Sequence, residues 1–127
     1  MKKIIFLLML GTIGFNMTAT AQKAINSIHF YDVKNADVEK TYIASLKEIN
    51  TIMAEMGFPK NYYSYHKLDA SDTTKTYRNC TIGHWTSEKD YKTIHDHPKF
   101  KAWGDKNKEN NGVYITGQLY RKFYDAD

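Results

Sequence analysis

The stretch GHWTSEKDYKTIHDHPKF, residues 83–100, decides the fold, because it contains the end of a strand, the start of a helix and a helix break. Trp85 ends a run of alternating side chains that begins at Lys75 and is typical of a strand. Ser87 then offers an N-cap for a helix with two acids in its first turn, where the helix dipole favours negative charge. Pro98 interrupts this helix, either as a kink or as the first residue of a short following helix.

The rest of the chain supplies the other elements of a small sheet covered by helices. Alternating side chains predict further strands, and apolar residues spaced three and four apart predict one long amphipathic helix. Gly57 is the natural end of that helix, and Pro59 prevents its continuation. The expected strands are residues 24–33, 61–68, 75–85 and 113–124, the long helix starts at residues 35–37, and residues 104–112 are expected to form a polar loop.

The order strand–helix–strand–strand–helix–strand predicts a ferredoxin-like α+β fold, with a four-stranded antiparallel sheet and two helices on one face. The other face would carry a mixture of tyrosine, histidine and aliphatic side chains. Such a face is poorly stable in water, and pairing two copies about a two-fold axis would bury both faces. We therefore predict a homodimer. We assign most of the ten tyrosines to strand packing and to this interface.

The first 21 residues have the pattern of a secretory signal peptide. Two lysines precede an apolar run over residues 4–10, and Ala19 and Ala21 stand at positions −3 and −1 before Gln22. Removing 21 of the 127 residues leaves 106, which suit one domain over residues 22–127. We therefore expect an exported protein, periplasmic or secreted. The leader is the only long apolar run, so we expect no membrane anchor.

Charge and cysteine content exclude several function classes. The net charge of +4 falls to +2 without the two leader lysines, which is too small a charge to indicate a nucleic-acid partner. Cys80 is the single cysteine, so no internal disulfide forms, and we interpret it as a small buried side chain. The five histidines include no HExxH or other helical metal-binding pair, and we expect no metal site.

Residues 83–91, followed by residues 95–100, resemble the dimeric α+β barrel superfamily and are most similar to antibiotic biosynthesis monooxygenase-like domains. In those enzymes the tryptophan that ends the third strand lies six residues before a tyrosine, as Trp85 lies before Tyr91 here. The resemblance implies a dimeric barrel with a small-molecule pocket between helices and sheet. In some members it implies oxidation of aromatic polyketides without metal or flavin, hence no cofactor. The same enzymes carry an asparagine where this chain has Thr81.

The resemblance and the residue types together give a candidate site. Trp85 and Tyr91 can line a pocket and stack on a flat ligand, or they can simply pack the helix on the sheet. His95 lies on the same helix face as Tyr91 and is the candidate catalytic acid or base, with a solvated histidine as the alternative. The other candidate pocket residues are Thr81, His66 and His29. Whether His29, His66 and His84 converge is left open, because they lie on separate strands.

Three functions are therefore compatible with the sequence. The first is a small exported enzyme resembling cofactor-independent monooxygenases and acting on a small aromatic or hydrophobic molecule. The second is a non-catalytic envelope protein that binds such a molecule in the same cavity. The third is an interaction module whose cavity is filled by its own side chains.

Overall fold

The structure is a computed structural model that describes residues 22–125, apart from the side chains of residues 109–118. The predicted signal peptide lies outside the described residues. The elements in chain order are β1 (Ile25–Val33), α1 (Ala36–Glu55), β2 (Tyr62–Lys67), β3 (Asn79–Trp85), α2 (Glu88–Asp96), α3 (Pro98–Tyr114) and β4 (Ile115–Tyr124). In the part of the chain that the structure describes, no helix is long and apolar enough to cross a membrane.

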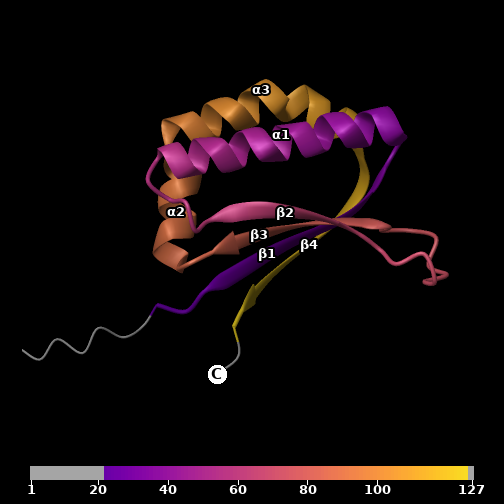
Figure 1. Cartoon of the computed structure of the whole chain (residues 1–127), viewed down its shortest axis with the longest axis horizontal. Coiled ribbons are helices and arrows are strands. Elements are labelled where there is room, and N and C mark those ends of the chain that lie inside the picture. Colours follow the sequence, from indigo (N-terminus) through magenta and orange to yellow (C-terminus); the bar gives the residue numbers. More distant parts are fainter. Residues whose placement is uncertain (1–21, 126–127) are drawn as a thin grey trace, which may run out of the picture.

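The four strands form one antiparallel sheet in the order β2-β3-β1-β4, and the helices lie on one face of it (Figure 1). Helices α1 and α3 run side by side over the sheet, and α2 lies at the end where β3 terminates. The arrangement confirms the ferredoxin-like α+β fold, with three helices where the sequence predicted two.

The third helix is the main correction to the sequence-based prediction. Residues 104–112, expected as a polar loop, lie within α3. Packing against α1 overrides the low helix propensity of the glycines and asparagines in this segment. The Trp103 indole N–H donates to the backbone carbonyl of Ser45 at 3.2 Å, and the Lys106 ammonium pairs with the Glu48 carboxylate at 2.7 Å. Neither contact with α1 is visible in the local sequence pattern.

The predicted helix starts are confirmed by their caps. The Asn35 side-chain oxygen accepts the backbone N–H of Val38 at 3.0 Å at the start of α1. At the start of α2, the Ser87 hydroxyl oxygen accepts the backbone N–H of Asp90 at 3.0 Å. Pro98 is the first residue of α3, so the second of its two expected roles is the one observed.

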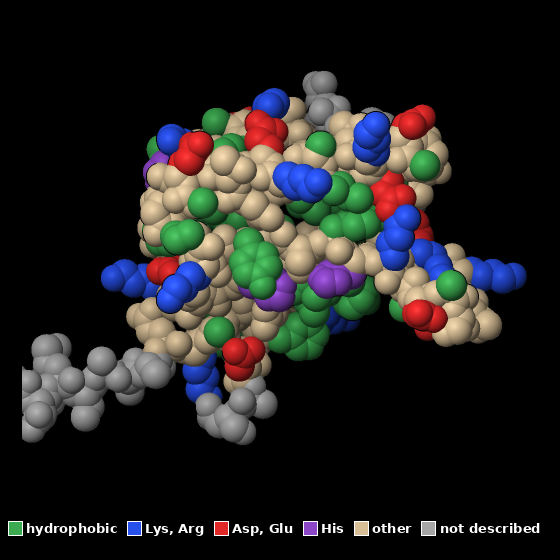
Figure 2. Space-filling view, in the orientation of Figure 1, with side chains coloured by type: hydrophobic (Ala, Val, Ile, Leu, Met, Phe, Trp, Pro, Cys, Tyr) green, Lys and Arg blue, Asp and Glu red, His purple; other side chains and the backbone are tan. Residues whose placement is uncertain are grey.

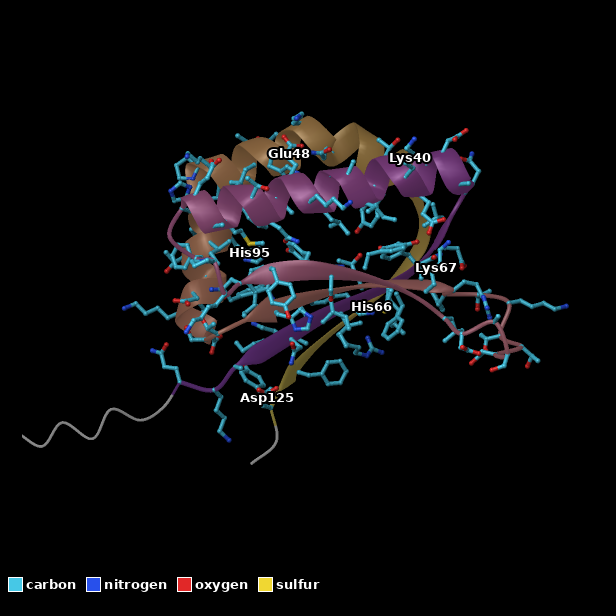
Figure 3. The ribbon with its side chains drawn as sticks, in the orientation of Figure 1. Lys40, Glu48, His66, Lys67, His95 and Asp125 are labelled. Atoms are coloured by element: carbon cyan, nitrogen blue, oxygen red, sulfur yellow. The ribbon has the colours of Figure 1, made fainter. Side chains whose placement is uncertain are left out.

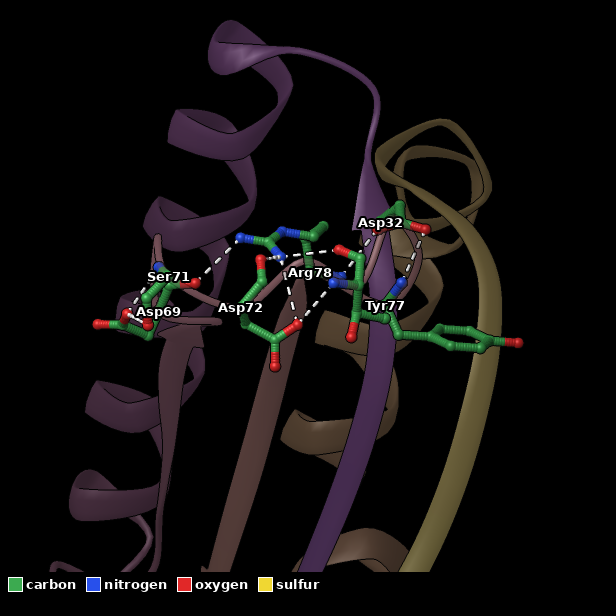
Figure 4. Close-up of polar contacts among 7 residues, drawn as sticks. Asp32, Asp69, Ser71, Asp72, Tyr77 and Arg78 are labelled. Carbon is green, nitrogen blue, oxygen red and sulfur yellow. Dashed lines mark hydrogen bonds and ion pairs between the residues drawn. The ribbon is translucent and has the colours of Figure 1, made fainter.

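The connection between β2 and β3 explains why β3 begins at Asn79 and not at residue 75. Tyr77 has a φ of +56°, so the extended backbone is interrupted there. The Asp32 carboxylate holds this turn by accepting the backbone N–H groups of Tyr77 at 3.0 Å and Arg78 at 2.9 Å. The guanidinium of Arg78 then donates to the backbone carbonyls of Asp69, Asp72 and Thr74 (Figure 4).

Gly83 gives the core tryptophan its position. A Cβ at Gly83 would lie 2.6 Å from the Ser27 hydroxyl oxygen and 2.7 Å from Cζ2 of Trp85. Because no side chain occupies that space, the Trp85 indole fits beside the strand and donates its N–H to Ser27 Oγ at 3.0 Å. Trp85 is 2% exposed and packs in a cluster with Ile25, Ile49, Met53 and Ile94.

We expect Gly83→Ala to lower the free energy of unfolding by about 1–3 kcal/mol, because the added methyl overpacks a close contact. Gly104→Ala is the matched control, since a Cβ there meets nothing within 4 Å and alanine favours a helix over glycine. Urea unfolding of the two variants measures the difference. A Gly83→Ala variant as stable as the wild type would show that the indole can move without cost.

The second face of the sheet has no helix over it among the described residues (Figure 1). Alternation along the paired strands places apolar side chains there, and Tyr62 and Phe123 are 44% and 48% exposed. Cys80, predicted as buried, is half-buried on this face. Figure 2 shows histidine side chains between hydrophobic ones in the middle of the visible face. The apolar side chains of this face are Ile28, Phe30, Tyr62, Ile82, Leu119 and Phe123.

Candidate functional site

The strand registers bring chemically active side chains to the sheet face under the helices. Gly83 pairs with Ser27, and Ser27 pairs with Lys122 on β4. In the neighbouring row His29 pairs with Tyr120 of β4, which places both on the same face as Ser27. We call the resulting group, together with the facing residues of α2, the His95 cluster. Its members are His29, Trp85, Tyr91, His95, Tyr120 and Lys122.

Trp85 forms the centre of the His95 cluster. Its ring meets those of Tyr63, Tyr91 and His95 edge-on, with ring centroids 5.3, 5.3 and 4.9 Å apart. Edge-to-face contacts of this kind add to the stabilisation from burial alone. Trp85 is therefore both a core residue and the side chain against which Tyr91 and His95 of α2 pack.

Helix α2 presents Tyr91 and His95 toward the sheet. Their ring centroids are 4.1 Å apart, and His95 also contacts the ring of Phe100 at 4.5 Å. Figure 3 places His95 on the inner side of α2, between the helices and the sheet. Nδ1 of His95 lies 2.7 Å from the backbone carbonyl oxygen of Tyr91. A carbonyl only accepts, so Nδ1 carries the proton, and in the neutral ring Nε2 keeps its lone pair as a proton acceptor.

Strand β4 and its neighbour β1 provide the opposite side of the cluster. The rings of His29 and Tyr120 are 4.6 Å apart, and the Lys122 ammonium lies 4.2 Å above the centre of the Tyr91 ring. Burial and a hydrogen bond with Tyr91 raise the pKa of Tyr120 to about 12. Tyr120 is 40% exposed, so the His95 cluster reaches the surface along β4.

The two histidines of the cluster are held in their neutral form. Burial lowers the pKa of His95 below its ordinary value of 6.5 and outweighs the hydrogen bond to the Tyr91 carbonyl, which raises it; the Lys122 charge lowers the pKa further. Burial also lowers the pKa of His29, as does the charge that His95 would acquire. At pH 7 the cluster therefore contains two neutral imidazoles, of which His95 has a defined tautomer.

We expect the free energy of unfolding to fall as the pH drops below about 6.5, because the unfolded chain then binds protons that the folded histidines still exclude. Substituting both His29 and His95 with glutamine removes the contribution of these two histidines to the pH dependence. Urea unfolding at pH 7.5 and pH 5 compares the wild type with the double variant. An equal loss in both proteins would contradict the burial of neutral histidines, because other groups, such as Glu39, would then explain the whole loss.

The remaining predicted pocket residues lie elsewhere. Thr81 is on the helix face, but it is buried and its hydroxyl bonds the phenols of Tyr31 and Tyr42, the latter at 3.1 Å. His66 pairs with Cys80 on the uncovered face, across the sheet from the His95 cluster. The structure thus brings Trp85, Tyr91, His95 and His29 together and separates His66 from them.

The structure also shows which of the three strand histidines lie close together. His66 and His84 approach one hydroxyl, with their Nε2 atoms 2.8 and 3.0 Å from Ser64 Oγ. His29 lies on the other face of the sheet. Among the described side chains, no three of His, Cys, Asp or Glu gather in a way that could hold a metal ion.

Sequence reasoning missed the β4 contribution to the site. The sequence indicates for Tyr120 only a role in strand packing or in the interface, and Lys122 belongs to no recognisable motif. Their membership depends on the register between β1 and β4, which a single sequence does not contain. The only available signal was the alternation of β4, which puts Tyr120 and Lys122 on one face.

Comparison with known proteins gives a fold but no sequence family. No family model matches the chain, and no curated protein matches it. Several solved structures resemble it over most of its length. A dimeric ferredoxin-like protein of unknown function from Thermobifida fusca has 14% identity and a TM-score of 0.58, with 81% of this chain and 92% of that chain covered.

A DABB family protein with a ferredoxin-like fold from Mesorhizobium loti has 14% identity and a TM-score of 0.59, covering 84% of this chain and 100% of that one. A hydroxynitrile lyase from Passiflora edulis has 11% identity and a TM-score of 0.62, covering 83% and 95%. Likenesses at these identities show a shared fold. The chain therefore has the ferredoxin-like fold, which is the fold that its sequence resemblance implies.

Proposed function

We propose that this chain is exported through residues 1–21 and that residues 22–127 act on a small aromatic or hydrophobic molecule held at the His95 cluster. The observation that carries the proposal is the tautomer and the protonation state of His95. Its Nδ1–H donates a hydrogen bond to the Tyr91 carbonyl oxygen, and burial keeps its ring neutral. A neutral imidazole with a free Nε2 lone pair beside three aromatic rings is suited to take a proton from a flat substrate.

The proposed reaction is of the cofactor-independent monooxygenase kind. His95 Nε2 accepts a proton from an acidic C–H of the substrate, and the electron pair stays on the substrate as a stabilised carbanion. The carbanion supplies its electrons to molecular oxygen, which is the co-reactant. Overall, an activated CH₂ group and O₂ give a C=O group and water. The reaction needs a base, here His95, and an aromatic side chain that orients the substrate ring, here Trp85.

The proposed working unit is a homodimer joined through the uncovered sheet face. Six apolar side chains lie there with no helix over them in the described part of the chain. An apolar sheet face left in water is a liability that a second copy removes. Two proteins with this fold, from Thermobifida fusca and Bacteroides fragilis, are described as dimeric.

A non-catalytic ligand-binding protein of the envelope is the second candidate, and one observation favours it. The resemblance places an asparagine of the oxygenases at Thr81, and the Thr81 hydroxyl is engaged by Tyr31 and Tyr42. Thr81 therefore differs from the asparagine in chemistry, and its hydroxyl is already hydrogen-bonded within the protein.

Oxygen uptake with an anthrone, which carries an activated CH₂ group, distinguishes the two functions. The enzyme hypothesis predicts consumption of O₂ and, with ¹⁸O₂ and an anthrone, one labelled oxygen atom in the product. Ligand binding measured by calorimetry without any uptake would support the binding protein. Uptake at the uncatalysed rate and no binding would contradict both.

A further inference from the structure

Lys122 is a charged residue in the His95 cluster that the proposed reaction has not used. It lies on β4 beside Ser27, on the sheet face under the helices, and it is half-buried. Its ammonium lies over the face of Tyr91, 4.2 Å from the ring centre. The ring attracts the cation through its quadrupole but does not neutralise the charge.

Within the described part of the chain, Lys122 has no acidic ion-pair partner. Among the side chains that the structure describes, no carboxylate forms an ion pair with it. Its titratable neighbours His29, His95 and Tyr120 are neutral near pH 7. The carboxylate that acts on His95 is that of Asp96, which is exposed and pairs with Lys101 at 3.4 Å. The cluster therefore has a net positive charge.

Building on the proposed function, we infer that the His95 cluster recognises a ligand with an anionic oxygen on or conjugated to an aromatic ring, and that Lys122 is the counter-ion of that oxygen. A phenol or enol meets this description after His95 has taken its proton. A preformed aromatic carboxylate meets it without proton transfer. Charge-assisted contacts to such an oxygen are stronger than neutral ones, so Lys122 determines specificity by charge.

The pair 4-nitrophenol and 4-nitroanisole tests the inference, because the two differ by one methyl and only the phenol can ionise. Calorimetry gives both affinities, and the visible absorption of 4-nitrophenolate reports deprotonation on the protein. Benzoate is the third ligand and represents the preformed carboxylate. Binding is compared in the wild type, Lys122→Met, Lys122→Arg and Lys47→Met. Lys47 is exposed on α1, so its variant changes the net charge equally away from the site.

The wild type and Lys47→Met are expected to bind 4-nitrophenol about tenfold more tightly than 4-nitroanisole at low salt, with the bound phenol ionised. Lys122→Met should lose this preference, and Lys122→Arg should retain most of it. Tighter binding of benzoate than of the phenol would also support Lys122 as counter-ion and would assign the anion to a carboxylate. Equal binding of all three ligands would overturn the inference and leave the proposed site in place. Binding of none of them would overturn the proposed site as well.

Discussion

His95→Gln is expected to reduce turnover of an oxidised substrate by about 10²–10⁴-fold, the range that a positioned general base contributes. Glutamine keeps the size and polarity of the side chain but cannot accept a proton at pH 7. The substrate still has Trp85 and Tyr91 to pack against, so the loss should appear in kcat and less in KM. Steady-state oxygen uptake gives both constants.

Two controls separate a catalytic from a structural effect of His95. His97→Gln removes a nearby histidine that lies at the end of α2 and accepts the backbone N–H of Lys99 at 3.1 Å. Its turnover should stay close to that of the wild type. Adding imidazole to His95→Ala should restore part of the rate, because the free base can occupy the vacated space. Full activity of His95→Gln would mean that the base is another group.

Trp85→Ala is expected to lower the free energy of unfolding by about 3–5 kcal/mol, the usual cost of deleting a buried indole. Trp85 is 2% exposed, contacts three aromatic rings and donates to Ser27. Trp85→Phe keeps a ring but loses the hydrogen bond, so it should cost less. Urea unfolding at fixed protein concentration measures both variants.

The same pair of variants also tests the dual role of Trp85. If the indole holds the α2 side chains in place, Trp85→Phe should fold and still bind ligand more weakly than the wild type. If Trp85→Ala lowers the free energy of unfolding by less than about 1 kcal/mol, the indole is not central to the core. Trp85 would then not be the residue that holds the α2 side chains of the site in place.

The sequence predicts those features of this protein that depend on neighbours along the chain. The Asn35 and Ser87 caps, the stop at Gly57 and the alternation of the strands all express local backbone preferences. The pairing of Tyr91 with His95 follows from a four-residue helix spacing. For this reason the strands and the first two helices were predictable, as were four of the six members of the His95 cluster, which are His29, Trp85, Tyr91 and His95.

The rest depends on contacts between segments that are distant in the sequence. Residues 104–112 have the composition of a loop, and they are helical because Trp103 and Lys106 bind α1. The face of the sheet on which a histidine lies is set by register, which separates His66 from His29. The same register brings Lys122 to Tyr91. None of these pairings leaves a motif in a single sequence.

Native mass spectrometry of the chain, produced with residues 1–21 and recovered from the exported fraction, tests the central claim most directly. One spectrum reports leader cleavage, the number of subunits and any retained small molecule. Our account predicts a dimer of residues 22–127 with additional mass from an aromatic ligand, and loss of that mass in Trp85→Phe. A ligand-free monomer would contradict it, because neither the sheet-face dimer nor the site at the His95 cluster would then exist in solution.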